Sequence, residues 1–538
     1  MEWYQLSTRR SSRWRPTPWL AGSLLVVLIA GALPLAWLTI VALGDIASSG
    51  AGLISSRTAV LFGNTVRLGI VVAVLVGVLG TTFGVLSTKT DLPGRRVLLA
   101  LLTFPLFLPP YILALGWFTV LGRHGLVAVV GGAAAGLWAS DMFFGLGGAV
   151  LVLTIAYTPI AMHLVRIALR SIDPTIEESA RLRFRWPRVL WRIDLPLVAP
   201  AIGLGMLVTF ILVVGEFGVP AYLRYPVFSG AVFTEFAASL NIRAAVVVSI
   251  PLMLLVLAGL GAERCWLRTP AQFLGRVRLT PLVAPLGAWR LPAALGGWAY
   301  AAVTVVVPLA GLEREAGGAA SYLAALRGAA SSIVVSVWTA AVAATIVLAA
   351  ALMVSYLVER TGSTRRNTLD TALLLLFAAP GTVLGVSLIL LWNRPGLTGI
   401  YTSVVILLIA YVAHYTPVAV RAVGVALQSV APAVEQAARL AGVPWITMIR
   451  RILVPSLAPA LAGVWGLTFV LCLRDLDLAM TVHPPGVETL PIRIYTLMAN
   501  SSSSVTAELA LLMVALTLAV MLVGGAAVAV ARRVSAWS

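Results

Sequence analysis

The sequence predicts an all-α membrane protein with about twelve transmembrane helices, arranged as two repeats of six. Of its 538 residues, 60% are hydrophobic and 11% are charged, whereas a soluble domain carries roughly 25% charged residues. Apolar stretches long enough to cross a bilayer, about 20 residues each, recur along the whole chain. Several short motifs also occur twice, once in each half. These observations exclude a soluble globular protein.

Twelve apolar windows are candidate spans. In the first half they cover residues 19–42, 64–87, 97–120, 146–169, 197–218 and 243–262. In the second half they cover residues 290–311, 331–357, 370–392, 400–424, 456–474 and 507–531. The stretch from Gly125 to Ser140 is apolar but short and glycine-rich, so we expect an outer loop or a re-entrant piece there. The run from Trp19 to Leu43 is too long for a cleaved signal peptide and predicts a retained first span.

Arginines indicate which loops face the cytoplasm. They gather in the N-terminal tail, in every second loop and in the C-terminal tail, while the alternate loops hold isolated arginines. By the positive-inside rule both termini are cytoplasmic, which agrees with an even number of spans. The formal net charge of +18 therefore reflects orientation in the bilayer and not nucleic-acid binding. Lys89 is the only lysine in the chain.

The internal repeat is visible as motifs that recur at a constant step. The tripeptide Tyr-Thr-Pro at residues 157–159 returns at residues 415–417, and Glu177 returns as Glu435, in each case 258 residues later. After a slip of one residue the step becomes 259. Since each copy has an even number of spans, both enter the membrane from the same side. We expect a pseudo-two-fold axis along the membrane normal, with a path between the two halves.

The best-matched region is a cytoplasmic loop between the fourth and fifth spans of each repeat. Asp173-Pro174 is a favourable helix start, because proline suits the first helical position. Glu177 and Arg181 are four residues apart, as are Glu435 and Arg439, so each pair lies on one helix face. Each repeat is therefore expected to carry a short amphipathic helix. Loops that only set topology would need basic residues, but not the same glutamate, alanine and proline spacing twice.

At these residues the chain resembles a known family, the permease subunits of binding-protein-dependent ABC importers, which carry a cytoplasmic EAA signature. The resemblance implies that each loop forms a coupling helix that docks in a groove of an ATPase subunit. The positions that match this coupling role are Glu177, Glu178, Ala180, Arg181 and Pro196 in the first repeat, and Glu435, Ala438, Arg439, Gly442 and Pro455 in the second.

The first copy departs from the signature at its helix end. It is one residue shorter, and Arg183 or Phe184 stands where the second copy has Gly442. Gly442 is expected to end its helix in a left-handed conformation, where a side chain would be strained. The first loop is therefore expected to dock with an altered geometry.

A single polypeptide with two six-span halves and two such loops resembles the fused permeases of the ferric iron and thiamine importers. The resemblance implies the type I ABC importer permease fold in the bacterial cytoplasmic (inner) membrane. The segment from Leu473 to Tyr495 is most similar to the ferric iron branch. The resemblance further implies two ATPase subunits and an external substrate-binding protein as partners. Ferric iron is then the expected substrate, with thiamine or another small solute as the alternative.

The chain has no phosphate-binding loop of its own. The nearest match, Gly84 to Thr90, has a threonine where the required glycine should precede the lysine. We therefore expect a transport protein that is not an enzyme, has no catalytic residues and binds no cofactor, with ATP and Mg on the partner ATPase subunits.

These features divide the chain into five segments. They are a cytoplasmic N-terminal tail (1–18), a first permease repeat (19–262) with its coupling loop at 170–196, a cytoplasmic linker (263–289), a second permease repeat (290–531) with its coupling loop at 425–455, and a cytoplasmic C-terminal tail (532–538).

Two other function classes compete with an ATP-driven importer. Cys265, Cys472 and the four scattered histidines form no metal or nucleophile motif, which argues against a metal site or a membrane enzyme. A proton-coupled secondary transporter can also be built from six plus six spans and would keep ionisable residues inside them. Few such residues are present, His163 and His414 among them.

The expected path for substrate contains two equivalent carboxylates. Glu216 and Asp475 are 259 residues apart, each at the outward end of a fifth span, so they would form an acidic vestibule for a cation. The alternative is that Asp475 pairs with Arg474 while Glu216 caps a loop or meets the binding protein. The fifth spans are also expected to face each other near the axis, at Phe210 and Thr468. Because an external protein largely selects the substrate, the sequence leaves its identity open.

Overall fold

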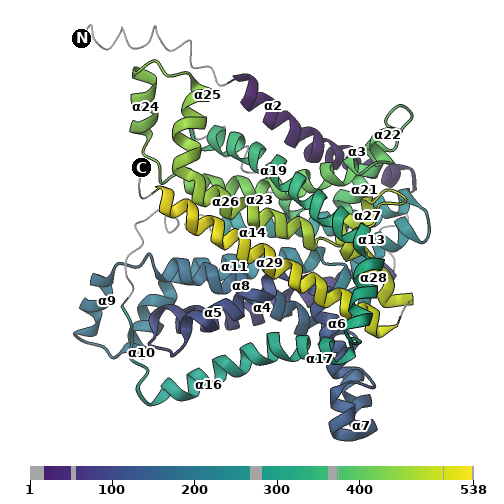
Figure 1. The fold of residues 1–538 in the computed structure, drawn as a ribbon, viewed down its shortest axis with the longest axis horizontal. Helices are drawn as coiled ribbons and strands as arrows, with labels where there is room; N and C mark the ends of the chain where they lie inside the picture. The colour runs from purple at the N-terminus through teal and green to yellow at the C-terminus, as the bar shows by residue number, and fades with distance from the viewer. Residues whose placement is uncertain are drawn as a thin grey trace.

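A computed structural model describes residues 17–49, 56–266, 282–360, 372–373, 375–500 and 502–535 (Figure 1). In this part of the chain the regular structure is helical, apart from one isolated parallel bridge between Thr90 and Ala284. The chain is therefore the all-α protein that its composition predicts.

The helices of the first repeat follow the predicted spans in order. They are α2 (Thr17–Val27), η2 (Leu28–Ala32), α3 (Leu33–Ser49), α4 (Ser56–Lys89), α5 (Arg95–Thr103), η3 (Phe104–Phe107), α6 (Pro110–Leu121), α7 (Leu126–Phe143), α8 (Leu146–Leu169), α9 (Pro174–Arg181), α10 (Trp186–Val189), η4 (Leu190–Asp194), α11 (Leu195–Gly215), α12 (Gly218–Tyr222), α13 (Phe228–Ala237) and α14 (Ile242–Trp266).

The second repeat runs through a corresponding series. Its helices are η5 (Gly287–Trp289), α16 (Arg290–Ala301), η6 (Ala302–Val306), α17 (Val307–Glu315), α18 (Ala319–Gly328), α19 (Ala330–Arg360), α21 (Gly381–Trp392), α22 (Thr398–Tyr401), α23 (Val405–Leu427), α24 (Pro432–Leu440), α25 (Trp445–Met448), η7 (Ile449–Leu453), α26 (Val454–Arg474), α27 (Asp477–Val482), α28 (Leu490–Asn500) and α29 (Ser503–Ser535).

In the described residues, eleven helices are long and apolar enough to cross a membrane, or twelve if one bent pair counts as a single span. This agrees with the prediction of about twelve, but the set of helices differs. The expected span 97–120 is the bent pair, which turns by 105° between Phe107 and Pro110, because consecutive prolines interrupt the helical hydrogen bonds there. The expected span 370–392 is broken at Ala379 and Pro380, between helical residues 375–378 and the short helix α21; residues 361–371 and 374 lie outside the described part.

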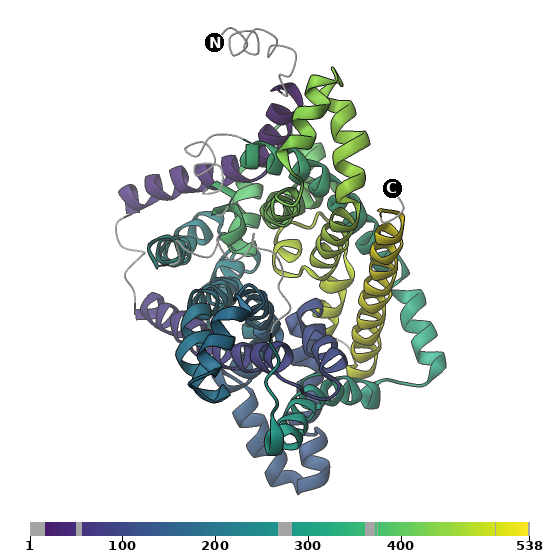
Figure 2. The same ribbon diagram turned by 90° about the vertical axis from the view of Figure 1, so that its left-hand side faces the viewer.

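Helix α7 accounts for the remaining difference. The stretch expected to be an outer loop or re-entrant piece is helical, but Gly132 interrupts it with a φ of +83°, so α7 is two short helices joined at a kink. It projects from the bundle in Figures 1 and 2.

The two repeats differ in length in this region. The repeat step is 271 between Lys89 and Arg360 but 258 between Tyr157 and Tyr415. The first repeat therefore has 13 extra residues (271 minus 258) in the region that contains α7.

Three helices form the core of each repeat, and the first span of each repeat crosses to the other. α4, α8 and α11 pack together in the first repeat, as α19, α23 and α26 do in the second. α2 and α3 pack on α19 and α21 of the second repeat, while α16 and α17 pack on α5 and α6 of the first. The two repeats are therefore interlocked.

Four π-helical turns have a common cause. η2, η4, η6 and η7 each end two residues before a proline, namely Pro34, Pro196, Pro308 and Pro455. Proline has no N–H to donate to the carbonyl four residues back, and a wider turn accommodates the missing bond. We expected Pro196 and Pro455 to precede the fifth spans. They lie instead inside continuous helices, Trp186–Gly215 and Trp445–Arg474.

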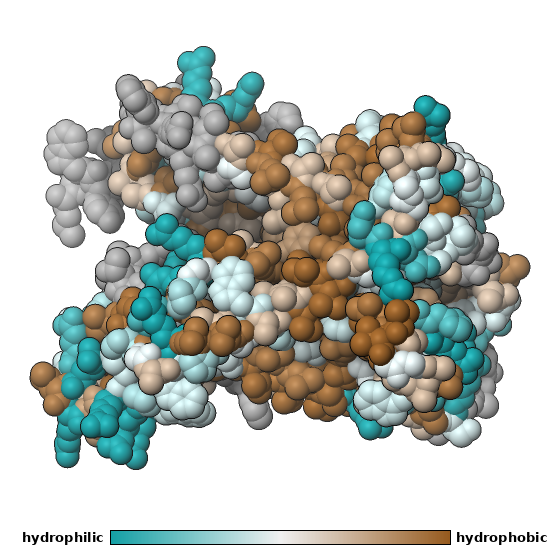
Figure 3. All heavy atoms as spheres, turned by 60° about the horizontal axis from the view of Figure 1, so that its bottom comes forward, coloured by the Kyte–Doolittle hydropathy of each residue, from teal (hydrophilic) through white to brown (hydrophobic). Residues whose placement is uncertain are grey.

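The arrangement has two polar ends and an apolar middle. Figure 3 shows hydrophobic residues gathered across the middle of one face, with hydrophilic residues toward both ends. In Figure 1 the loop helices α9 and α24 lie at the same end of the bundle, where α2 begins and α29 ends. An even number of crossings produces this placement, and an apolar band of this kind suits a bilayer.

The interlocking of the repeats depends on a close contact between α6 and α17. A Cβ added at Gly116 would lie 2.8 Å from Pro308 Cβ and 2.9 Å from its carbonyl oxygen, so a side chain there forces the two helices apart. We expect Gly116→Ala to destabilise the folded protein by roughly 1–3 kcal/mol, measured as thermal unfolding in detergent or nanodiscs. Gly463→Ala is the matched control, because a Cβ there meets nothing within 4 Å. Equal unfolding temperatures for the two variants would show that the contact does not limit packing.

Candidate functional site: two anchored loop helices and a cavity between the repeats

The first loop helix, α9, begins as its sequence predicts. Asp173 is its N-cap, and the carboxylate accepts hydrogen bonds from Thr175 N at 3.0 Å and Thr175 Oγ1 at 2.8 Å. These hydrogen bonds favour the ionised form and hold the pKa of Asp173 below its ordinary value. Pro174 occupies the first helical turn, where its missing N–H costs nothing.

The two loop helices end differently. Gly442 has a φ of +74°, which confirms the left-handed end expected for α24, and Val443 N donates to Ala438 O at 3.0 Å. In the described residues the only non-glycine positions with positive φ are Arg224 and Leu240. The first loop, one residue shorter, thus ends without a left-handed residue at Phe184. The missing residue and the missing glycine therefore belong to one change, in the turn that follows the loop helix. In the sequence this change is visible only as a departure from the signature.

Glu177 anchors the first loop helix to the end of the second span. Lys89, the last residue of α4, donates from Nζ to Glu177 Oε1. Both side chains are buried, with exposures of 2% and 0%. The glutamate of the signature therefore points into the bundle and does not face outward.

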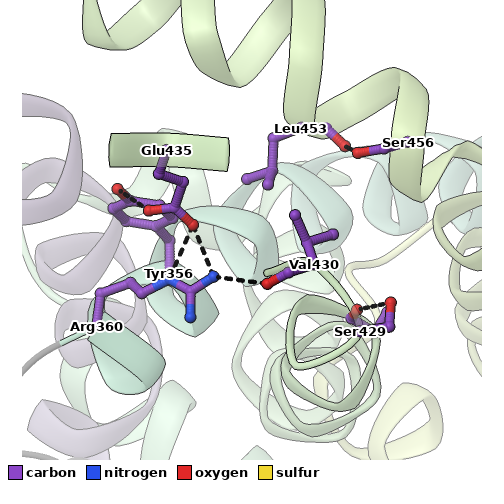
Figure 4. A network of polar contacts seen from close by, with 8 residues as sticks. Tyr356, Arg360, Ser429, Val430, Glu435, Leu453 and Ser456 are labelled. Atoms are coloured by element: carbon purple, nitrogen blue, oxygen red, sulfur yellow. Dashed lines mark hydrogen bonds and ion pairs between the residues drawn. The ribbon is translucent and has the colours of Figure 1, made fainter. Parts of the chain in front are cut away.

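Glu435 anchors the second loop helix in the equivalent way (Figure 4). Arg360, the last residue of α19, donates to Glu435 Oε1 from Nη2 at 2.6 Å and from Nε at 2.9 Å. Tyr356 donates from its hydroxyl to Glu435 Oε2 at 3.0 Å. The exposures are 23% for Arg360 and 11% for Glu435, so this anchor is less deeply buried than the first.

The basic partners were not identified from the sequence. Lys89 and Arg360 are 271 residues apart, whereas Glu177 and Glu435 are 258 apart, so a search at a constant step misses them. The signal that could have found Lys89 is its status as the only lysine. Arg181 does not pair with Glu177 as their helical spacing suggests; its guanidinium lies over the Trp186 ring, 4.7 Å from the centroid.

The outward surface of each loop helix is apolar at its tip. Leu182 is 92% exposed and its equivalent, Leu440, is 89% exposed. Ile176 and its equivalent Val434 are also exposed. Among the predicted coupling residues, Glu178 is exposed and Ala438 is buried. Exposed apolar groups at matched positions of both loops are typical of a docking surface.

A cavity of about 270 Å³ lies between the repeats. Both repeats line it with equivalent residues: Tyr157 and Tyr415, Ile160 and Val418, Val208 and Leu467, Leu212 and Leu471, Glu216 and Asp475. The cavity therefore lies between the two equivalent helix sets, where the duplication predicts the path.

Each repeat contributes one tyrosine–carboxylate pair to this cavity. Tyr157 donates to Glu216 Oε2 at 2.9 Å, and Tyr415 donates to Asp475 Oδ2. The remaining carboxylate oxygens cap the next short helix: Glu216 Oε1 accepts from Val219 N at 3.4 Å, and Asp475 Oδ1 accepts from Leu478 N at 3.1 Å. Both carboxylates thus line the cavity and also cap a loop.

Two residues of the second repeat reach across to the first. Arg474 donates to the carbonyl oxygens of Leu106 and Leu108, the latter at 3.1 Å. Asp477 Oδ2 accepts from Phe217 N at 3.2 Å. The expected alternative pairing of Arg474 with Asp475 is replaced by these carbonyl contacts, because the break after Phe107 leaves carbonyls without helical partners.

Phe210 and Thr468 do not line the cavity. Phe210 packs against Gly69 of α4, where an added Cβ would lie 2.7 Å from the ring. Thr468 is buried and donates to Val464 O at 2.9 Å. Its equivalent at the step of 259 is Thr209, not Phe210. The residues of the two fifth spans that do face the cavity include Ile211 and Leu467.

No metal centre is evident within the part of the chain that the structure describes, where no three His, Cys, Asp or Glu side chains group together to hold an ion. His163 bonds to Thr103 Oγ1 at 2.9 Å and to Arg166 Nη1 at 3.2 Å. His414 lines the cavity and lies edge-on to Tyr415.

Known proteins match the second half of the chain and, at 23–27% identity, most of its length. A family model described as the binding-protein-dependent transport system inner membrane component matches residues 347–536. A putative ferric transport system permease protein, FbpB 1, of Haemophilus influenzae is 27% identical over 425 residues, covering 73% of this chain and 66% of the relative. The ferric transport system permease protein FbpB of Actinobacillus pleuropneumoniae is 26% identical over 424 residues, covering 73% of this chain and 61% of the relative.

The alignments to these two relatives therefore span less than two thirds of their lengths. A third relative, the Fe(3+)-transport system permease protein FbpB 2 of Haemophilus influenzae, is 23% identical over 526 residues and covers 93% of this chain and 96% of the relative. The likeness to this relative includes both repeats.

The anchors differ in burial, which predicts different costs of removing their cations. Lys89→Met leaves Glu177 buried without its ammonium, and breaking a buried pair costs about 3–5 kcal/mol. Arg360→Met is expected to cost less, because Glu435 keeps its hydrogen bond from Tyr356 and some solvent contact. Thermal unfolding of the purified protein measures both effects. The double variant Lys89→Met/Glu177→Gln should recover most of the loss, and no recovery would contradict the pairing.

Proposed function

Because residues 347–536 match the family of inner membrane components of binding-protein-dependent transport systems, we propose that the chain is a permease of an ATP-driven importer, with both halves of the translocation path on one polypeptide. Substrate passes from an external binding protein into the cavity between the repeats, and from there to the cytoplasm. The chain performs no chemistry itself, and ATP and Mg belong to its partners.

The observation that carries this proposal is the duplicated loop helix. Each helix exposes a leucine, Leu182 or Leu440, and is held to the bundle by a buried or half-buried ion pair. A loop that is anchored inside and apolar outside can transmit movement between a docked partner and the spans. Two such loops on one chain favour two copies of an ATPase subunit, and the cavity shared by the two repeats favours one external binding protein.

Ferric iron is the proposed substrate. The three relatives described above are named as ferric transport permeases. The cavity presents the carboxyl groups of Glu216, Asp475 and Asp477, with one guanidinium, Arg474. This excess of acidic groups favours the passage of a cation, although the three carboxyl groups are not grouped as a metal site. Thiamine or another small solute is the alternative within the same transporter class.

The location and orientation follow from the same proposal. The chain is a multi-pass protein of the bacterial cytoplasmic membrane, with α9 and α24 on the cytoplasmic side. Both termini are then cytoplasmic, because α2 begins and α29 ends at the level of these loops (Figure 1).

The function is tested by reconstituting the permease in liposomes with its ATPase and with iron-loaded binding protein outside. We expect iron uptake that requires internal ATP and the ATPase, and that continues when an uncoupler removes the proton gradient. Uptake driven by a proton gradient without ATP would support a secondary transporter instead.

The exposed leucines provide a test of docking that leaves the anchors intact. Leu182→Asp/Leu440→Asp places charges in an apolar interface but costs little in the free permease, since both side chains are in solvent. We expect loss of co-purification with the ATPase and loss of stimulated hydrolysis, with unchanged thermal unfolding. Arg183→Asp, a neighbouring change of charge, controls for electrostatic effects of the loop. Retained co-purification in the double leucine variant would place docking elsewhere.

The two cavity carboxylates provide a test of the cation path. Glu216→Gln/Asp475→Asn keeps the shape and the tyrosine contacts through the amide oxygen, removes the acidic groups, and gives up the bonds from Val219 N and Leu478 N, because an amide nitrogen cannot accept. Losing about 1.4 kcal/mol of attraction changes a rate tenfold, so iron uptake should fall roughly tenfold or more while ATPase stimulation persists. Glu488→Gln, which neutralises a carboxylate paired with Arg493 outside the cavity, is the control. Parallel loss of binding-protein docking would assign the carboxylates to that interface.

A further inference from the structure

The first anchor contains one carboxyl group more than the second. Asp194, the last residue of η4, is fully buried, and neither of its carboxylate oxygens has a hydrogen-bond partner. Glu177 Oε2 is also buried without a partner. At the equivalent position of the second repeat, 259 residues later, stands Leu453. The first repeat thus combines two carboxyl groups with a single cation, Lys89.

These three side chains act on one another directly. The Asp194 carboxyl lies beside the Glu177 carboxyl, and the charged groups that act on it are Glu177 from α9 and Lys89 from α4. An ionised carboxylate only accepts hydrogen bonds, so two of them in contact repel each other and leave their oxygens unsatisfied. Away from water this arrangement is costly, and one carboxyl of such a pair takes up a proton.

We propose that Asp194 carries a proton, which it donates to Glu177, and that this proton keeps the first loop helix seated on the bundle. The shared proton leaves one ionised carboxylate opposite one ammonium, so the buried charges balance. It also gives the unsatisfied oxygen of Glu177 a donor. Asp194 is therefore a positioning residue for the first loop; its effect on coupling rests on the proposed function.

The proposal makes the first loop sensitive to pH and the second loop insensitive. When alkaline conditions remove the proton, two carboxylates face one ammonium in a buried site, and the loop helix is pushed away. The second anchor has no corresponding group, because Leu453 replaces the aspartate and Glu435 is bound by Arg360 and Tyr356. Loss of the proton should therefore uncouple one half of the permease.

The proton itself is tested on the purified permease without any partner. Infrared spectra should show an absorption of a protonated carboxyl at neutral pH that disappears in Asp194→Asn and persists in Glu178→Gln, a matched loss of a solvent-exposed carboxylate from the same loop. If Asp194→Asn leaves the protonated-carboxyl absorption unchanged, the proposal is overturned.

The consequence is tested by the pH profile of ATPase stimulation in the reconstituted importer. The amide introduced by Asp194→Asn donates at every pH, so this variant should retain stimulation and move its alkaline decline upward by about one pH unit or more. Asp194→Ala should lose stimulation at all pH values. Glu178→Gln should keep the shape of the wild-type pH profile, whether or not it changes the amount of stimulation. An unchanged profile in Asp194→Asn overturns the positioning role. If neither the wild type nor any variant stimulates hydrolysis, the proposed function fails. The infrared result still shows whether Asp194 carries a proton.

Discussion

Each half of this protein depends on an ion pair, buried in the first repeat and partly buried in the second, that joins the end of the second span to the loop helix after the fourth span. A glutamate and a cation buried away from water each lose hydration, and the pair is favourable only while the two charges remain together. The pair therefore fixes where the loop helix lies. Because Glu177 and Glu435 point inward to Lys89 and Arg360, the outward surface of each loop is left to residues such as Leu182 and Leu440, which a partner can bury.

The rest of the fold links the two anchored loops mechanically. The first spans cross between repeats, so the halves cannot move as independent bodies, and the cavity lies where their equivalent helices meet. The duplication is nevertheless uneven. The first repeat has a longer segment around α7, a turn without a left-handed residue and an extra buried carboxyl at Asp194. The second repeat supplies Arg474 and Asp477, which reach across to the first.

The sequence predicted the features that depend on local chemistry and on the repeat. Hydropathy predicted the spans, and the constant step of 258 residues between repeated motifs located the two loops. Gly442 predicted the left-handed end of the second loop helix. The features that the sequence did not predict depend on contacts between distant segments. Lys89 and Arg360 were overlooked because 13 extra residues near α7 change the repeat step between them and their glutamates. Phe210 and Thr468 were placed toward the axis although they are not equivalent. The bend after Phe107 and the four π-turns depended on what a proline does inside a buried helix, which hydropathy does not report.

The central claim is that each repeat carries its own docking loop for an ATPase subunit. Crosslinking from one cysteine introduced at position 182 or 440 of a chain whose Cys265 and Cys472 are replaced by serine, followed by native mass spectrometry of the detergent-solubilised complex, tests it most directly. We predict that either cysteine captures one ATPase copy and that a chain with both cysteines captures two. A complex with one ATPase copy per chain, or crosslinks from only one of the two loops, would contradict the account.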